Sequence, residues 1–253
     1  MLEYITSGAG HPILVLVNGA GGPLEGWYKI YPALERMGTV FAYNRPGTGG
    51  STAPHVPQTG NVVVTMLRAL LEEAGLSPPY LLVGHSLGGL YVNLFARCFP
   101  HDVAGVVLLD AAAPDDVALQ TTHQTLLHRV INGLLALLPN NAAHASNSES
   151  AWVTETIQQI AAAGPFPDVP LLVVTGGKAP PRWLASQTAL QLRQQNQQAL
   201  ARLSRHGRQI IAGRSGHFPQ FTEPDLVIEA IRTVIDSWQQ RTTTTGTSPE
   251  APT

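Results

Sequence analysis

Short apolar runs and longer helical patterns alternate along this chain, and that alternation limits the possible folds more than any other feature. The strand candidates are rich in Val, Ile and Leu and fall at residues 13–17, 39–43, 80–84, 104–109, 171–175 and 208–212. Helical patterns fall at about 24–36, 61–75, 88–99, 182–206 and 225–239. Nearly continuous apolar runs are typical of strands buried on both faces, as in a parallel sheet. The alternation therefore predicts an α/β fold with a doubly wound, mostly parallel sheet.

One interval breaks this alternation. Between Asp110 and Leu171 the sequence has helical stretches and no convincing strand. Residues 117–138 and 151–163 carry the helical patterns, and a polar segment joins them. We therefore expect residues 114–167 to form a helical lid inserted over the sheet.

The rest of the chain divides into a core and a tail. A length of 253 residues suits one large domain that carries an insertion. Residues 1–113 and 168–238 hold the alternating elements, so we assign them to the α/β core. Residues 239–253 are polar and rich in threonine, and we expect them to be disordered.

Composition excludes several classes of function. The net charge of −2, without a basic cluster, gives no electrostatic footprint for nucleic acid or an anionic membrane. Cys98 is the only cysteine, which excludes disulfides and cysteine-based metal sites. The first residues read as strands rather than as a secretory signal, and no apolar run approaches the ~18 residues of a membrane span. We expect a soluble, cytoplasmic protein, and the sequence leaves its oligomeric state open.

A serine stands between two glycines directly after one of the buried runs. In "VGHSLGGLY" (83–91), Ser86 has Gly84 and Gly88 two positions away on either side. Ligands of open α/β sheets bind at the carboxyl ends of the strands, where Ser86 falls. A sharp strand-to-helix turn strains the serine backbone and requires small neighbours, and the helix N-terminus adds free N–H groups. This context favours a nucleophile over a chance match to G-x-S-x-G.

Four segments, in this order, resemble motifs of the α/β-hydrolase family. They are "VNGAGG" (17–22), similar to its oxyanion loop, "AYNRPGTGGS" (42–51), "GHSLGG" (84–89), similar to its nucleophile elbow, and "GRSGHFPQFTEPDLV" (213–227), similar to the segment with its histidine. The resemblance covers about residues 2–238. It implies a hydrolase fold with a Ser–His–acid triad and a lid.

The base that would activate Ser86 is predicted to be His217. A serine hydroxyl is a poor nucleophile until a base takes its proton. Among the nine histidines, His217 follows a late strand on a loop beside Gly216, and its segment resembles the family pattern. A purely structural role is the alternative. His85, held inside the elbow, is expected to pack rather than act as the base.

The acid of the triad is predicted to be Asp110. Many relatives carry the acid after the strand that corresponds to 171–175, but no Asp or Glu occurs between Asp168 and Glu223. Asp168 precedes that strand, so we expect it at the opposite edge of the sheet. The family has a second arrangement with the acid one strand earlier, and Asp110 fits it, 24 residues after Ser86. The alternative for Asp110 is a helix or turn cap.

Two backbone N–H groups are needed to hold the oxygen of a tetrahedral intermediate. The resemblance implies that Leu87, next to the nucleophile, and Ala20, in "NGAGG", supply them. The chain has Asn18-Gly19 where the family usually has His-Gly, but a backbone donor at Ala20 does not depend on the residue 18 side chain. A simple tight turn is the alternative for this segment.

Aromatic residues and histidines are the candidates for a substrate pocket, with plain core packing or solvent exposure as the alternative. They are Trp27, Trp152, Phe166, Trp183, His123 and His128.

The leading hypothesis is a serine hydrolase that cleaves a small, apolar carboxylic ester or lactone without a metal or organic cofactor. C–C bond hydrolysis, perhydrolysis, acyl transfer and hydroxynitrile cleavage remain open on the same scaffold. So does a non-catalytic protein that binds small molecules.

Overall fold

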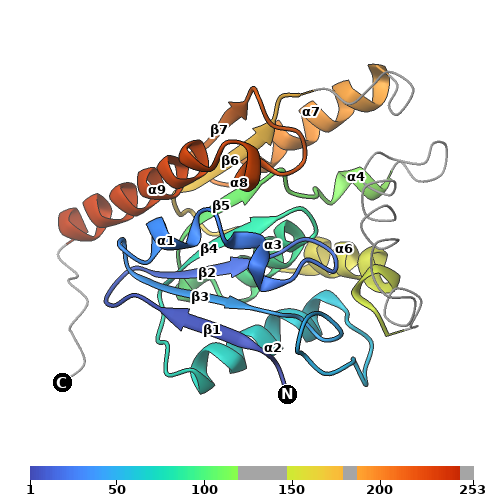
Figure 1. The fold of residues 1–253 in the computed structure, drawn as a ribbon. Coiled ribbons are helices and arrows are strands. Elements are labelled where there is room, and N and C mark those ends of the chain that lie inside the picture. The colour runs from blue at the N-terminus through green and yellow to red at the C-terminus, as the bar shows by residue number, and fades with distance from the viewer. Residues whose placement is uncertain (119–146, 179–186, 246–253) are drawn as a thin grey trace.

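The structure, a computed structural model, describes residues 1–118, 147–178 and 187–245 (Figure 1). These residues form a seven-stranded sheet of order β1-β3-β2-β4-β5-β6-β7. β1 runs antiparallel to β3, and all other neighbours are parallel, which confirms the predicted α/β fold. The strands are β1 (Tyr4–Ser7), β2 (Ile13–Val17), β3 (Thr39–Tyr43), β4 (Tyr80–His85), β5 (Val103–Leu109), β6 (Leu171–Gly176) and β7 (Gly207–Ala212).

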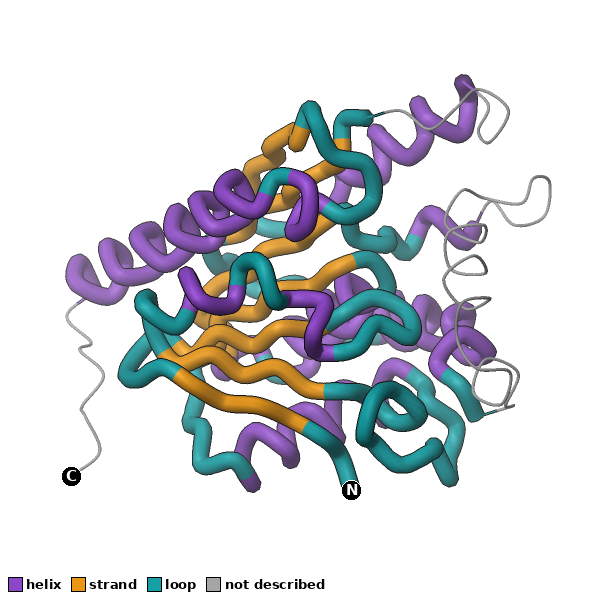
Figure 2. Tube along the Cα trace, in the orientation of Figure 1, coloured by secondary structure: helices purple, strands orange, loops and turns teal. Residues whose placement is uncertain are grey.

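Helices cover both faces of this sheet (Figure 2). One face carries α2 (Gly60–Glu73), α3 (Gly88–Cys98), α6 (Val153–Ala162) and α7 (Gln187–Ala201). The other carries η1 (Leu24–Trp27), α1 (Tyr31–Leu34) and α9 (Pro224–Thr245). Shorter elements are η2 (Pro100–Asp102), α4 (Asp115–Ala118), η3 (Glu149–Trp152) and α8 (Pro219–Thr222).

The central strands read as unbroken apolar runs because each of their faces packs against one helical layer. In β2, Ile13, Val15 and Val17 belong to the core under α2 and α3. Leu14 and Leu16 belong to the core under α1 and α9. The strand β1 is not among the predicted runs, since most of its side chains are exposed at the edge of the sheet.

The helix predicted at 24–36 is interrupted in the structure. η1 and α1 are each four residues long and are separated by a turn. Pro32 lies in the first turn of α1, where its missing N–H costs nothing, but a longer helix would bring its ring against the carbonyl of Tyr28. The prediction of one continuous helix there is wrong.

The helix α9 corrects the predicted tail. It continues to Thr245, so residues 239–245 are helical rather than disordered. The hydroxyls of Thr242, Thr243 and Thr244 donate to backbone carbonyls one turn earlier, so these side chains bond to their own helix. Residues 246–253 lie outside the described part of the chain.

Part of the predicted lid packs as a layer of the core. In α6, Val153, Thr156 and Ile160 are buried, and the helix packs against α2 and α3 on one face of the sheet. The lid segment 119–146 lies outside the described residues. No helix in the described ranges is long and apolar enough to cross a membrane.

Candidate active site

Ser86 lies in a tight turn between β4 and α3. Its backbone is in the left-handed region, with φ of 52°, and its side chain is fully buried. A Cβ built on Gly84 would lie 2.9 Å from the Gly88 carbonyl oxygen, and one on Gly88 would overlap the carbonyl oxygen of Val17. The turn therefore accepts only glycine at both positions, as the sequence predicts.

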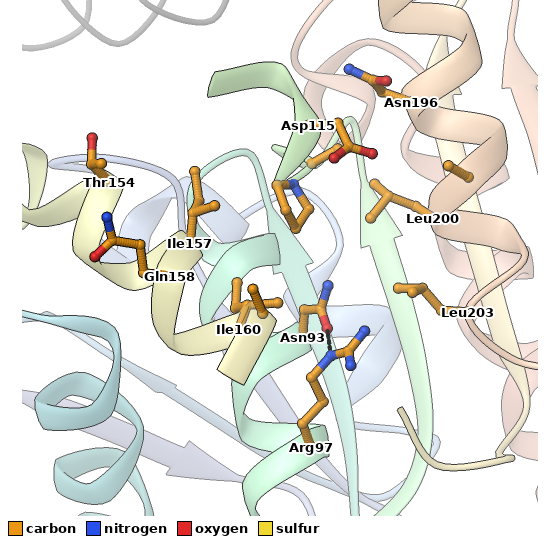
Figure 3. Close-up of a pocket in the computed structure, with 14 residues that line it drawn as sticks. Asn93, Arg97, Asp115, Thr154, Ile157, Gln158, Ile160, Asn196, Leu200 and Leu203 are labelled. Atoms are coloured by element: carbon orange, nitrogen blue, oxygen red, sulfur yellow. Dashed lines mark hydrogen bonds between the residues drawn. The ribbon is translucent and has the colours of Figure 1, made fainter. Parts of the chain in front are cut away.

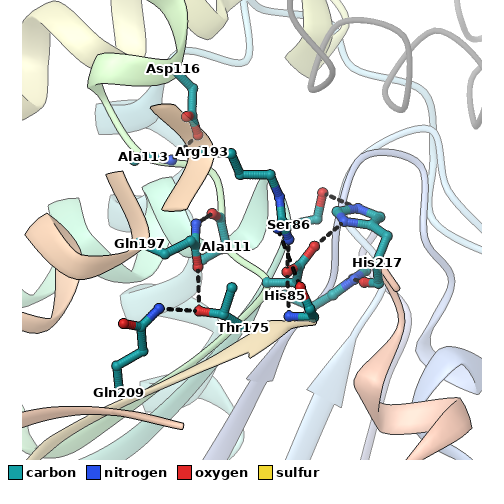
Figure 4. A network of polar contacts seen from close by, with 12 residues as sticks. His85, Ser86, Ala111, Ala113, Asp116, Thr175, Arg193, Gln197, Gln209 and His217 are labelled. Atoms are coloured by element: carbon teal, nitrogen blue, oxygen red, sulfur yellow. Dashed lines mark hydrogen bonds and ion pairs between the residues drawn. The ribbon is translucent and has the colours of Figure 1, made fainter. Parts of the chain in front are cut away.

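His217 and Asp110 lie beside this serine (Figure 4). The Nε2 of His217 is 2.9 Å from the Oγ of Ser86, and its Nδ1 is 2.8 Å from Oδ2 of Asp110. Asp110 directly follows β5, and His217 lies between β7 and α8. The parallel strands thus bring together three side chains that are far apart in the sequence. A proton on Nδ1, facing the carboxylate, leaves Nε2 free to accept the serine proton.

Asp110 is held in its ionised form. It accepts hydrogen bonds from the Gly176 amide at 2.8 Å and from the guanidinium of Arg193. Burial alone would raise the pKa of Asp110, but the His217 hydrogen bond and the Arg193 charge outweigh it and lower the pKa to about 2. A carboxylate is therefore present beside His217 at neutral pH.

Polar side chains of α7 support the Asp110 turn and were not found from the sequence. Arg193, Asn196 and Gln197 share one face of the helix, at the i, i+3 and i+4 spacing. Asn196 donates to Oδ1 of Asp116, and Gln197 donates to the carbonyl of Ala111, each at 2.6 Å. Their spacing is the signal by which the sequence could have indicated these residues, but the many other polar residues of this glutamine-rich helix obscure it.

His85 faces away from the serine hydroxyl, as the sequence predicts. Its Nε2 donates to the backbone carbonyl of His217 at 2.8 Å, and its ring packs on those of His217 and Phe218. Burial is the main cause that lowers the pKa of His85 to about 3. His85 is therefore neutral and braces the loop that carries His217.

The loop with Ala20 passes directly over Ser86. A Cβ built on Gly19 would lie 2.9 Å from the Cβ of Ser86, so the backbone approaches the serine as closely as glycine allows. Ala20 and Leu87 are buried on either side of the serine. Within the described ranges, neither of their amide groups donates a hydrogen bond.

Of the candidate pocket residues, Trp27, Trp152 and Phe166 lie within the described ranges. Trp27 is buried in the core under α1 and α9. Phe166 is partly buried and packs against the core ahead of β6, at the amino edge of the sheet. Trp152 is half-buried at the junction of η3 and α6. His123, His128 and Trp183 lie outside the described residues.

A separate cavity lies between α3, α6 and α7 (Figure 3). It has a volume of about 490 Å³, and its apolar walls include Ile157 and Leu200. Arg97 and Asn93 also line it, and Arg97 donates a hydrogen bond of 2.7 Å to Asn93. Ser86 does not line it. This cavity is therefore separate from the substrate pocket that the sequence predicts at Ser86.

Other acidic groups lie elsewhere. Asp168 pairs with Arg205 ahead of β6, at the amino edge, where the sequence predicts it. Asp116 accepts from the Ala113 amide and Asn196 and does not contact His217. No cluster of three or more His, Cys, Asp or Glu in the described ranges is arranged to hold a metal ion.

Comparisons with known proteins agree with this architecture. A family model of the alpha/beta hydrolase fold matches residues 12–134. The chain is 30% identical over 218 residues to the uncharacterized protein YqjL of Bacillus subtilis, covering 86% of this chain and 81% of that protein. It is 35% identical over 104 residues to Methylesterase 9 of Arabidopsis thaliana, covering 40% of each.

Solved structures share the fold at lower identity. The enol-lactonase from Burkholderia xenovorans LB400 superposes with a TM-score of 0.65 and 18% identity, covering 93% of this chain and 96% of that one. At that identity the likeness concerns the fold alone.

Proposed function

Because this chain belongs to the α/β-hydrolase family, we propose that it is a serine hydrolase that cleaves a carboxylic ester or lactone. The observation that carries the proposal is the unbroken hydrogen-bond chain from Ser86 through His217 to Asp110. It lies at the carboxyl edge of the sheet, where ligands of this architecture bind.

In the proposed reaction Ser86 attacks the carbonyl carbon of the substrate. His217 takes the hydroxyl proton on Nε2 and then delivers it to the leaving alcohol. Asp110 keeps the Nδ1 proton in place and stabilises the imidazolium that forms. The ionised state of Asp110 at neutral pH supports this role.

The developing oxyanion is proposed to bind the amides of Ala20 and Leu87. Both belong to segments fixed against the serine, so their dipoles need little reorganisation as negative charge builds on the oxygen. A water molecule, activated by His217, then attacks the acyl-enzyme, and Ser86 regains its proton. Each of these steps uses side chains and backbone groups of the chain itself.

Esters and lactones are proposed as substrates from two kinds of support. One similar protein is named as a methylesterase, and one structure of the same fold is that of an enol-lactonase. The serine nucleophile, with a histidine base beside it, suits acyl transfer to water. The complete hydrogen-bond chain also argues against a protein that binds small molecules without catalysis, since nothing in binding alone requires it.

A labelling experiment tests the proposal. A fluorophosphonate probe is expected to modify wild-type protein at Ser86 and to leave Ser86→Ala unmodified. Turnover of short p-nitrophenyl esters and of lactones should disappear in the same variant. Ser237→Ala, on the far helix α9, is the matched control and should behave as wild type. A wild-type protein that neither labels nor hydrolyses any of these substrates would refute the proposal.

A further inference from the structure

A buried ion pair joins the loop after β3 to the short helix η3. The Nη2 of Arg45 is 3.1 Å from Oε1 of Glu149, and its Nε bonds to the other carboxylate oxygen. The two side chains are 3% and 12% exposed. They lie 104 residues apart in the sequence, and Glu149 belongs to the segment that the sequence assigns to the lid.

The remaining polar atoms of this pair bind the backbone of the loop over Ser86. Arg45 donates through Nη1 to the carbonyl of Asn18 at 2.8 Å and through Nη2 to the carbonyl of Gly19. Glu149 accepts from the amide of Gly21 through Oε1 at 2.8 Å. Arg45 and Glu149 therefore hold the backbone on both sides of Ala20.

Because of peptide geometry, these contacts determine the direction of the Ala20 N–H group. The Gly19 carbonyl and the Ala20 amide belong to the same planar peptide unit, in which a trans bond directs C=O and N–H to opposite sides. Fixing the Gly19 oxygen on Arg45 fixes the direction of the Ala20 N–H. The Gly21 amide belongs to the next peptide unit, which Glu149 fixes directly.

Stability alone is a weak reason for a buried pair at this place. Removing two charges from water costs about as much as their attraction returns, so apolar side chains of similar volume often serve as well. Burial opposes the charge of Arg45, and Glu149 more than compensates, so the pKa of Arg45 is raised. Glu149 thus offsets the cost of burying the Arg45 charge behind the loop.

We propose that Glu149 is a positioning residue for the oxyanion site: through the Gly21 amide and Arg45 it directs the Ala20 N–H toward the oxygen bound at Ser86. This inference rests on the proposed function. It also gives the segment that the sequence assigns to the lid a part in the chemistry of the site.

Kinetics of two Glu149 variants test this role. Glu149→Gln keeps an acceptor for Gly21 and loses the charge that holds Arg45, and Glu149→Asp keeps the charge and draws it back by one methylene. Loss of a whole oxyanion donor costs about 10²–10³ in kcat. We expect kcat on a p-nitrophenyl ester to fall by about 10-fold or more in Glu149→Gln and by less in Glu149→Asp, with KM changed by less than about 3-fold.

A transition-state analogue separates positioning from general support. A trifluoromethyl ketone forms an adduct with the serine whose oxyanion occupies the proposed site, so its affinity should fall in parallel with kcat. Hydrogen exchange at the Ala20 and Gly21 amides should become faster in Glu149→Gln. Glu155→Gln, on α6, is the matched control and should leave all three measurements unchanged.

The outcomes distinguish this inference from the proposed function. If wild type labels and hydrolyses esters, but both Glu149 variants keep kcat and inhibitor affinity, Glu149 is not a positioning residue. A drop in thermal midpoint without a drop in kcat leads to the same conclusion. If wild type itself is inactive and unlabelled, the proposed function fails, and this inference fails with it. Glu149→Asp keeps the test valid if Glu149→Gln does not fold.

Discussion

Ser86 and Asp110 share a backbone conformation that most residues avoid. Their φ angles are 52° and 43°, in the left-handed region, and they occupy the turns that end the neighbouring strands β4 and β5. The Ser86 amide bonds to the Leu109 carbonyl, and its own carbonyl accepts from Ala112, so the two turns hold each other. Strain of this kind persists only where the surroundings enforce it. Here the enforced geometry directs both side chains toward His217.

Replacing the acid tests the triad at the level of one residue. Asparagine tolerates the left-handed conformation, so Asp110→Asn should fold. Its amide favours the wrong imidazole tautomer and leaves the imidazolium without a counter-charge. We expect kcat to fall by about 10⁴, as in the triad template. Steady-state ester hydrolysis measures this, and Asp168→Asn is the control, expected to keep near-full kcat. Near-full activity of Asp110→Asn would show that another group is the acid.

Single residues of the site differ in how far the sequence could predict them. Ser86 sits in a local motif, and Asp110 follows from the absence of any acid between Asp168 and Glu223. Arg193 lies 83 residues from its partner Asp110, and Glu149 lies 104 residues from Arg45. Contacts at such separation depend on how elements pack, and neither charge lies in a motif of its own.

At the scale of elements, close approach of α3 to β2 sets the position of the elbow. A Cβ on Gly88 would overlap the carbonyl oxygens of Val17 and Asn18, so Gly88→Ala must push helix and strand apart. We expect a loss of about 1–3 kcal/mol in the free energy of unfolding, with hydrolysis impaired as well. Urea denaturation measures the change. Gly213→Ala is the control, because a Cβ there meets nothing within 4 Å. Equal stability of the two variants would contradict this account.

Elements were predictable where burial alone decides their structure. The parallel strands β2 to β6 are buried and apolar on both faces, and each predicted run overlaps an observed strand. Predictions failed at Pro32, where the helical pattern of 24–36 is interrupted, and at the threonine run that forms the last turn of α9. Most side chains of the edge strand β1 are exposed, so this strand is not an apolar run in the sequence.

On the scale of the whole molecule, the ionised Asp110 links stability to pH. Its pKa is lowered from 3.8 to about 2 in the folded protein, so it stabilises the fold fully above the unfolded pKa. That contribution, about 2 kcal/mol, is lost as the pH falls from about 4 through 2. The free energy of unfolding of wild type, measured with urea, should lose about half of this Asp110 contribution between pH 6 and pH 3.

Two variants check the origin of that loss. Asp110→Asn has no carboxyl to titrate, so its stability relative to wild type should improve on going from pH 6 to pH 3. Arg193→Met removes one of the charges that lower the pKa of Asp110, so its own loss over that interval should be smaller. An identical pH dependence in all three proteins would show that Asp110 titrates normally.

The fold of the whole molecule can be predicted from the alternation of strands and helices more readily than its substrate specificity can. The doubly wound sheet is predicted from this alternation, and the meeting of Ser86, Asp110 and His217 follows from the rule that ligands bind at the carboxyl ends of parallel strands. The substrate pocket does not, because no periodicity fixes how the insertion packs. Phe166 illustrates the difference: the sequence makes this aromatic residue a pocket candidate, and the fold packs it, partly buried, at the amino edge of the sheet.

The helix α3 begins beside Ser86 and ends at Cys98, an exposed thiol. Eleven residues of helix separate the two by about 16 Å, and the chain has no other cysteine. A maleimide dye can therefore be attached at one defined place, behind the nucleophile and clear of its approach. The native sequence thus offers a ready-made anchor for fluorescence or surface immobilisation, with no engineered mutation needed.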